Sequence, residues 1–181
     1  MNQPLRILIL EDRPEDVELI QRELRRMEIG PLTKCVVTLK EFLLALEEFQ
    51  PDLVISDHNL LGFTGMEALK LGRLRYSELP FILVTGALGE ELAVETIKQG
   101  ATDYILKHRL GQLVPAILRA VREAEQRAQR RQAEELLKRQ HKQLTAQNNA
   151  LQESEQRFRQ LAENVHEGFV TRRAVQRQII Q

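Results

Sequence analysis

Four apolar segments of the chain each end on side chains that can bind a cation or a phosphate group. One of them, residues 52–57, is an apolar run that ends on the carboxylate of Asp57. It is too short for a core helix, contains β-branched residues and lies between Pro51 and Gly62, so the pattern predicts a buried strand. The other segments are 5–10, which ends on Glu11 and Asp12; 81–84, which ends on Thr85; and 104–106, which ends on Lys107.

Parallel strands that lie side by side bring their carboxyl ends to one edge of a sheet, where open α/β proteins bind ligands. If the four segments are such strands, three carboxylates, a hydroxyl and an ammonium converge there. An acidic pocket of oxygen ligands suits Mg²⁺, which keeps several waters and bridges to phosphate oxygens. Glu11, Asp12 and Asp57 are therefore the candidate metal ligands.

The same group of side chains suits phosphoryl transfer. Asp57 is the candidate nucleophile, and its carboxylate needs no general base because it is already ionised at neutral pH. Lys107 and Thr85 are candidates to bind phosphate oxygens. Phosphoryl transfer depends mainly on positioning and on neutralising charge, and these groups provide both.

The elements that would position these side chains alternate along the chain. Helical patterns begin near Pro14, Thr38, residue 66 and Glu90, each after one of the first four predicted strands. Gly30-Pro31 should stop the first helix, and a loop containing Gly62 and Gly65 should precede the third. Five strand–helix alternations over roughly 110 residues, with connections too long for hairpins, predict an α/β fold with a parallel sheet and helices on both faces. The predicted strands are 5–10, 32–37, 52–57, 81–84 and 102–106, and Cys35 in the second is interpreted as a core residue.

Composition limits the class of protein. Residues 1–110 contain 13 Lys and Arg against 18 Asp and Glu, whereas residues 111–181 contain 13 against 8. The acidic half holds the predicted site, which suits a cation and argues against nucleic acid. A single cysteine excludes an internal disulfide. No apolar run reaches membrane-spanning length and the N-terminus lacks a signal peptide, so a cytoplasmic protein without a membrane segment is expected.

From Gly111 onward the sequence predicts one long helix, rich in Glu, Gln, Arg, Lys and Ala. Its first part is apolar enough to pack on the sheet. Further on, apolar residues recur every seven positions, which predicts a coiled coil and a homodimer through 123–165. The contact seam of this coiled coil would comprise Leu137, Leu144, Leu151, Phe158 and Val165, with Ala133, Gln140, Gln147, Ser154 and Leu161 at the alternate seam positions.

Glu11-Asp12, Asp57, Thr85 and Lys107, at these intervals, resemble the response-regulator receiver domain of two-component signalling. The resemblance covers residue 5 to about residue 122. It implies a doubly wound, flavodoxin-like sheet of strand order 2-1-3-4-5. It also implies that Asp57 accepts a phosphoryl group from a histidine kinase or a histidine phosphotransfer protein.

The resemblance assigns further roles. The backbone carbonyl of Asn59 would complete the Mg²⁺ ligands, and Tyr104 would move with Thr85 on activation. Asn59 and Ala87 fall where the family tunes dephosphorylation. Two positions depart from the family pattern: Leu61 and His108 stand where proline is usual, and His108 leaves the conformation of the loop after the fifth strand open.

Residues 154–164 resemble the entry helix of a PAS sensor domain, but no PAS core follows. Either the chain is part of a longer signalling protein or its tail has diverged. The expected organisation is a receiver at 1–122, a coiled-coil extension at 123–165 and a tail at 166–181, which would be a truncated PAS start.

The main hypothesis is a phosphoacceptor with self-catalysed transfer and slow autodephosphorylation, not an enzyme with turnover. An unphosphorylated dimerisation scaffold is one alternative. A small Mg²⁺-dependent phosphatase is another, although such enzymes usually carry a second Asp two residues after the nucleophile, where this chain has Asn59.

Overall fold

The computed structural model describes residues 4–28, 30–86 and 90–178; it leaves out the side chains of 90–93, 150, 153, 158 and 161–178. The chain divides into two compact units, Met1–Ala128 and Gln129–Gln181. Within the described residues, no helix combines the length and the apolar character that a membrane span requires.

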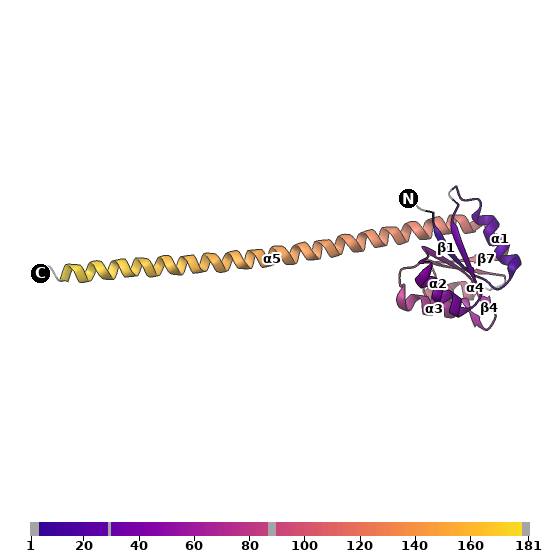
Figure 1. Ribbon diagram of the computed structural model, residues 1–181, viewed down its shortest axis with the longest axis horizontal. Helices are drawn as coiled ribbons and strands as arrows, with labels where there is room; N and C mark the ends of the chain where they lie inside the picture. Colours follow the sequence, from indigo (N-terminus) through magenta and orange to yellow (C-terminus); the bar gives the residue numbers. More distant parts are fainter. Residues whose placement is uncertain (1–3, 29, 87–89, 179–181) are drawn as a thin grey trace. The chain divides into compact units, whose positions relative to one another are not determined.

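The first unit is built on a parallel sheet of five strands in the order β2-β1-β3-β6-β7 (Figure 1). This is the predicted order 2-1-3-4-5, because β4 (Asn59–Leu60) and β5 (Phe63–Thr64) pair only with each other in a small antiparallel hairpin. The sheet strands are β1 (Arg6–Leu10), β2 (Leu32–Val36), β3 (Leu53–Asp57), β6 (Phe81–Thr85) and β7 (Asp103–Leu106).

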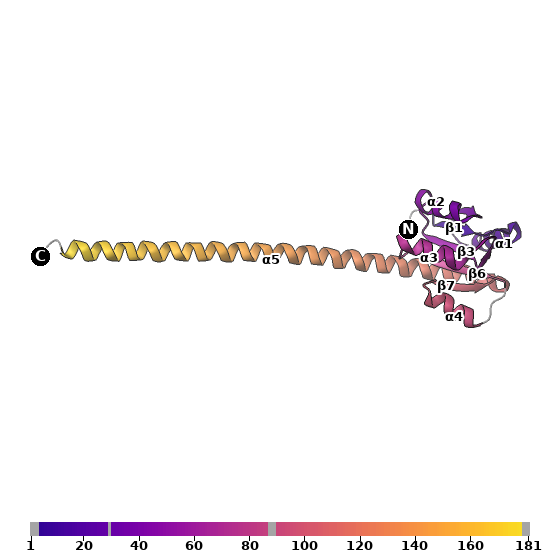
Figure 2. The ribbon, with the colours of Figure 1, turned by 90° about the horizontal axis from the view of Figure 1, so that it is seen from below.

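Helices cover both faces of this sheet, as the alternating pattern predicted (Figures 1 and 2). In Figure 1, α1 and the first turns of α5 lie above the sheet, and α2, α3 and α4 lie below it. The helices are α1 (Pro14–Leu24), α2 (Leu39–Glu48), α3 (Gly65–Arg75), α4 (Glu90–Lys98) and α5 (Leu113–Gln178), with a 3₁₀ segment, η1 (Lys107–Gln112), before α5.

Alternation along the strands divides the core into two layers. Ile7 and Ile9 of β1 point into the layer that α1 and α5 close, whereas Leu8 and Leu10 point into the layer beneath α2 and α3. β3 and β6 are buried along their whole length, which a central parallel strand covered on both faces requires. The central strands therefore hold the site residues at their ends rigidly.

Several details differ from the sequence prediction. α1 ends at Leu24, before the predicted stop at Gly30. Cys35 is exposed, so the core assignment was wrong; β2 is an edge strand, and four of its five residues are not buried. The β4–β5 hairpin occupies what was expected to be a plain loop, and Gly62 takes a φ of 88° at its turn, a value that glycine tolerates.

The described part of the second unit is all helical, and α5 continues to Gln178. Every residue from 129 to 160 whose side chain is described is exposed. Three leucines of the heptad series are more than half exposed: Leu137, Leu144 and Leu151.

Candidate functional site

The register of the sheet aligns the ends of its strands. Leu10 pairs with Ser56, so the residues that follow, Glu11 and Asp57, lie side by side. Val84 pairs with Asp57, and Leu106 pairs with Thr85. The carboxyl ends of β1, β3, β6 and β7 therefore meet at one edge of the sheet, as the sequence predicted.

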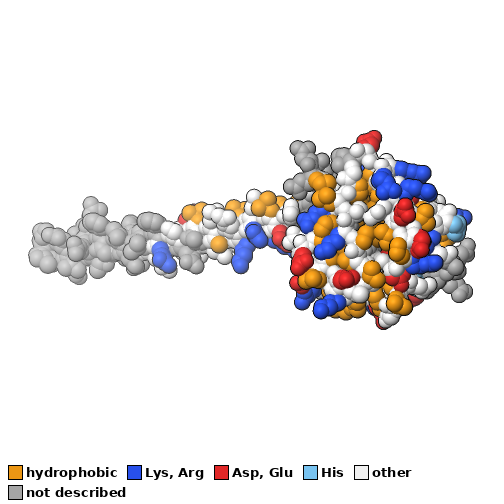
Figure 3. Space-filling model, turned by 45° about the vertical axis from the view of Figure 1, so that its right-hand side comes forward, with side chains coloured by type: hydrophobic (Ala, Val, Ile, Leu, Met, Phe, Trp, Pro, Cys, Tyr) orange, Lys and Arg blue, Asp and Glu red, His pale blue; other side chains and the backbone are white. Residues whose placement is uncertain are grey.

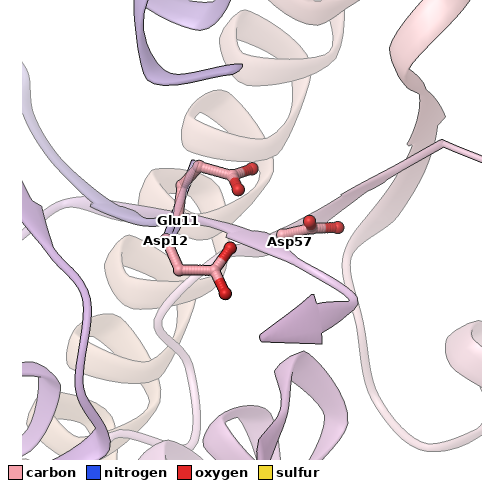
Figure 4. A group of neighbouring side chains, drawn as sticks. All are labelled: Glu11, Asp12 and Asp57. Carbon is pink, nitrogen blue, oxygen red and sulfur yellow. The ribbon is translucent and has the colours of Figure 1, made fainter. Parts of the chain in front are cut away.

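Three carboxylates form an acidic cluster there: Glu11, Asp12 and Asp57 (Figure 4). One oxygen of each lies within 4.8 Å of the others. The backbone N–H of Leu61 donates to Asp12 Oδ2 at 2.9 Å, whereas Asp12 Oδ1 is buried and has no hydrogen-bond partner in the described part of the chain. A buried carboxylate oxygen without a donor is costly unless a cation or water fills the space beside it.

Lys107 brings a positive charge to this cluster. Its Nζ lies 2.8 Å from Asp57 Oδ2 and 3.0 Å from Glu11 Oε2. A third carboxylate, Asp16 of α1, lies closer still, 2.6 Å from the same nitrogen. Burial opposes the charged form of Lys107, but the hydrogen bonds to Asp16, Asp57 and Glu11 outweigh it and raise the pKa of the ammonium.

Asp16 was not predicted to belong to the site. The sequence presented it only as an acidic residue in the first turn of a helix, a position where acidic residues are common. Its sequence separation from Lys107 is 91 residues, so no local pattern could have linked the two.

Glu11 is almost fully buried, and burial raises the pKa of its carboxyl group to about 7. The hydrogen bond from Lys107 lowers this pKa, and the negative charge of Asp57 raises it further. Near neutral pH the cluster therefore carries less negative charge than three free carboxylates would. A divalent cation would relieve the same repulsion.

The backbone around Asp57 fixes its carboxylate. The N–H of His58 donates to Asp57 Oδ1 at 2.6 Å, and the N–H of Asn59 lies 3.4 Å from the same oxygen. The Ser56 hydroxyl donates to the Asp57 carbonyl at 2.8 Å. Gly65 packs against that carbonyl so closely that a Cβ would overlap it. Asp57 is thus held from both sides, with one oxygen bound to backbone N–H groups and the other to Lys107.

Two predicted residues carry buried polar atoms without partners. Thr85 Oγ1 and the Tyr104 hydroxyl are both buried and accept or donate no hydrogen bond among the described residues. Thr85 lies at the end of β6, next to the strand of Asp57. Burial raises the pKa of the Tyr104 phenol, so this group remains neutral and able to donate.

The remaining predicted positions are less informative. The Asn59 side chain is exposed at the start of β4. Ala87 lies outside the described residues. The Lys107–His108 bond is trans, like the other described peptide bonds, and η1 begins at Lys107. This observation settles the conformation that the sequence left open.

The cluster fits a magnesium ion. Its donors are all oxygen atoms, it is partly closed to solvent, and one of its oxygens lacks a partner. Mg²⁺ prefers such hard ligands and is commonly bound by one or two carboxylates together with phosphate oxygens. The fold and the site together define an α/β protein with an acidic edge that suits a cation, beside a lysine.

The sequence model of the response regulator receiver domain matches residues 7–118. The chain therefore belongs to the receiver-domain family of two-component response regulators.

Curated relatives agree with this assignment. The chain is 42% identical over 83 residues to the response regulator protein FleR of Pseudomonas aeruginosa, a match covering 39% of this chain and 17% of FleR. It is 31% identical over 115 residues to the transcriptional regulatory protein AfsQ1 of Streptomyces coelicolor, covering 64% of this chain and 50% of AfsQ1. The chain thus matches half or less of the length of each of these relatives.

Solved structures share the fold. A CheY-like receiver domain protein from Methanospirillum hungatei superposes with a TM-score of 0.61 at 25% identity, covering 69% of this chain and 99% of that one. The receiver domain of a Luxo repressor-like protein from Vibrio parahaemolyticus gives a TM-score of 0.63 at 21% identity, covering 70% and 96%. At that identity, the second likeness concerns the fold alone.

Proposed function

We propose that this receiver domain is a phosphoacceptor, phosphorylated on Asp57 by a histidine kinase or a histidine phosphotransfer protein. The observation that carries the proposal is the 2.8 Å contact between Lys107 Nζ and Asp57 Oδ2 beside the acidic cluster. A reactive carboxylate, a cation-binding cluster and a phosphate-binding ammonium then share one pocket. The ends of the sheet strands supply the reactive carboxylate, the acidic cluster and the ammonium.

In the proposed step, an oxygen of the Asp57 carboxylate attacks phosphorus. The new P–O bond forms as the P–N bond of a phosphohistidine breaks, and the imidazole leaves as the neutral ring after taking up a proton. Lys107 binds an oxygen of the transferred group, and the unpartnered Thr85 hydroxyl donates to another. Backbone N–H groups of His58 and Asn59 hold the carboxylate in place.

Glu11, Asp12 and Asp57, with the backbone carbonyl of Asn59, would hold Mg²⁺. When bound, the ion would supply positive charge that neutralises the carboxylates and so lowers the charge barrier to transfer. The unpartnered Asp12 Oδ1 supports this assignment.

Activation would use the two buried, unpartnered hydroxyls. If Thr85 turns toward a phosphoryl oxygen, space opens beside it for Tyr104. The Tyr104 hydroxyl makes no hydrogen bond among the described residues, so the ring can move without breaking one. Asn59 and Ala87 would tune the lifetime of the acyl phosphate. The chain would turn over phosphate only through its own slow dephosphorylation, and not as an enzyme acting on a separate substrate.

Beyond the receiver at 1–122, we infer a coiled-coil extension at 123–165 that joins two copies and carries the signal toward an output. The exposed leucines at seven-residue spacing support it. The tail at 166–181 would be the start of a PAS-like segment.

The test is incubation of the whole chain with Mg²⁺ and acetyl phosphate, followed by intact-mass measurement. The wild type should gain one phosphoryl group, and Asp57→Asn should gain none. Asp52→Asn is the matched control, because Asp52 precedes the same strand at its other end and its carboxylate accepts from the Arg6 backbone N–H, away from the site. An unlabelled wild type would favour the scaffold alternative. Rapid turnover of phosphate esters would favour the phosphatase alternative.

A further inference from the structure

Asp16 contacts the catalytic lysine from a helix that carries no other site residue. It is the third residue of α1, whose first is Pro14. Its carboxylate is the nearest of the three around Lys107, at 2.6 Å compared with 2.8 Å for Asp57 and 3.0 Å for Glu11. The side chains of Asp16 and Lys107 are each only 16% exposed.

A simpler interpretation would make Asp16 an ordinary helix-start residue that complements the helix dipole. The contacts do not favour it. No side-chain cap bond is formed at the start of α1. The other described contact of Asp16 is with Arg13, at 3.8 Å, and the Arg13 side chain is 70% exposed, so solvent screens that pair.

An ammonium group has three N–H donors, and here three carboxylates accept them. Two of the three, Glu11 and Asp57, belong to the acidic cluster. When Lys107 donates to a phosphoryl oxygen, it must give up one existing contact. Asp16 stands outside the cluster, so its contact with Lys107 can persist when a contact to the cluster is lost.

We propose that Asp16 is a positioning residue that anchors Lys107 beside Asp57 both before and after phosphorylation. This inference rests on the proposed function. It predicts that the anchor matters for the transfer step itself. Asp16→Asn keeps the shape and one acceptor oxygen but loses the charge, and Asp16→Ala loses both.

The experiment measures the rate of Asp57 labelling by acetyl phosphate at saturating Mg²⁺, over a range of donor concentrations. Asp16→Asn should lower the rate constant at saturating donor about fivefold and Asp16→Ala on the order of tenfold or more, because charge-assisted hydrogen bonds are strong and small displacements of a catalytic group are costly. Asp16→Glu, which restores the charge, should recover part of the loss.

Two variants serve as controls. Glu15→Gln makes the same change of charge at the adjacent, exposed position of α1. Arg13→Gln removes the other described partner of Asp16. Both should label at the wild-type rate, and all variants should melt near the wild-type temperature, which separates positioning from loss of fold.

Equal rates in the wild type and both Asp16 variants would overturn the inference, as would an equal loss in Glu15→Gln. A wild type that takes no label would instead overturn the proposed function, and this inference with it. The two failures differ because the second is visible before any variant is compared.

Discussion

Glu11 shows how a single buried residue couples the site to pH. Its carboxyl group has an ordinary pKa of 4.5 that burial raises to about 7 in the folded protein. Between these two pH values the folded state keeps a proton that the unfolded chain has already released. The stability that this group contributes is therefore complete below pH 4.5 and is lost as the pH rises through about 7.

The metal-free protein should accordingly lose stability from this group between pH 4.5 and 8. One pKa unit corresponds to about 1.4 kcal/mol, so the loss from Glu11 is ~3 kcal/mol at most. Urea unfolding across this range, in wild type and Glu11→Gln, isolates the contribution. The difference in unfolding free energy should move in favour of the variant as the pH rises.

Magnesium provides the check on this prediction. If the cluster holds Mg²⁺ as proposed, the ion binds the deprotonated carboxylate, and its stabilising effect on the wild type should grow with pH. If the difference in unfolding free energy between wild type and Glu11→Gln stays constant across the pH range, Glu11 does not titrate within that range.

Removal of the Thr85 hydroxyl should stabilise the unphosphorylated protein. Its buried hydroxyl has no partner among the described residues, and a buried unsatisfied donor costs free energy. Thr85→Val replaces the hydroxyl by a methyl group of similar shape. We expect the unphosphorylated variant to be about 1 kcal/mol more stable in urea unfolding, and its acyl phosphate to be shorter-lived than that of the wild type. A less stable variant would mean that the hydroxyl is satisfied by water.

The residues of the site differ in how far the sequence could reveal them. Glu11, Asp57 and Lys107 each end an apolar run, so strand periodicity alone placed them at the same edge. Asp16 could not be found in this way, because its contact with Lys107 depends on how α1 packs against η1, and no pattern within α1 encodes that. The unpartnered state of Thr85 likewise depends on packing and not on residue type.

At the scale of elements, the start of α3 is fixed by a close approach to β3, the strand that ends at Asp57. A Cβ on Gly65 would overlap the Asp57 carbonyl and come within 2.6 Å of a methyl carbon of Leu83. Both neighbours belong to central strands that are buried throughout, so neither can move easily. The absence of a side chain at Gly65 lets α3 begin beside the site.

Gly65→Ala should therefore destabilise the protein by about 2–3 kcal/mol, as overpacking of a core does. Gly72→Ala is the matched control on the same helix, since a Cβ there would meet Phe42 only at 3.5 Å, in ordinary contact. That variant should be neutral or slightly stabilised, because alanine favours a helix over glycine. Denaturant unfolding of both variants measures the difference in their stability. Equal effects would show that β3 and β6 shift to make room for the added methyl group.

Element boundaries were predictable where local chemistry marks them. Thr38 caps α2, and its hydroxyl and the Glu41 carboxylate form a capping box. The same motif, Thr64 with Glu67, starts α3 and was readable in the sequence although it was not used. The exposure of Cys35 depends on which strand forms the edge of the sheet. Edge position is a property of the topology that strand periodicity does not carry.

At the scale of the whole molecule, surface charge and exposed apolar residues bear on the kind of partner. On the face in Figure 3, acidic and basic side chains are interspersed with apolar ones and form no broad surface of one sign. The second unit, in contrast, exposes apolar side chains at regular intervals. Leu137, Leu144 and Leu151 are 65%, 57% and 59% exposed, so a sizeable apolar surface has no partner within the described chain.

If this seam joins two copies, Leu137→Glu should weaken the dimer strongly. A buried leucine contributes roughly 2 kcal/mol and is lost in both copies, so the dissociation constant should rise about 1000-fold. Leu136→Glu makes the same change one residue away, ~100° around the helix and outside the seam, and should have a much smaller effect. Sedimentation equilibrium of the whole chain measures both.

Gln140 and Gln147 give the reverse test of the same seam. A polar residue at such a position costs stability in a coiled coil while fixing its register. Gln140→Leu should therefore tighten the dimer, and a second substitution at Gln147 should tighten it further. A wild type that stays monomeric at high concentration, or a Gln140→Leu variant that dimerises no better than wild type, would rule out this seam and leave the exposed leucines to a different partner.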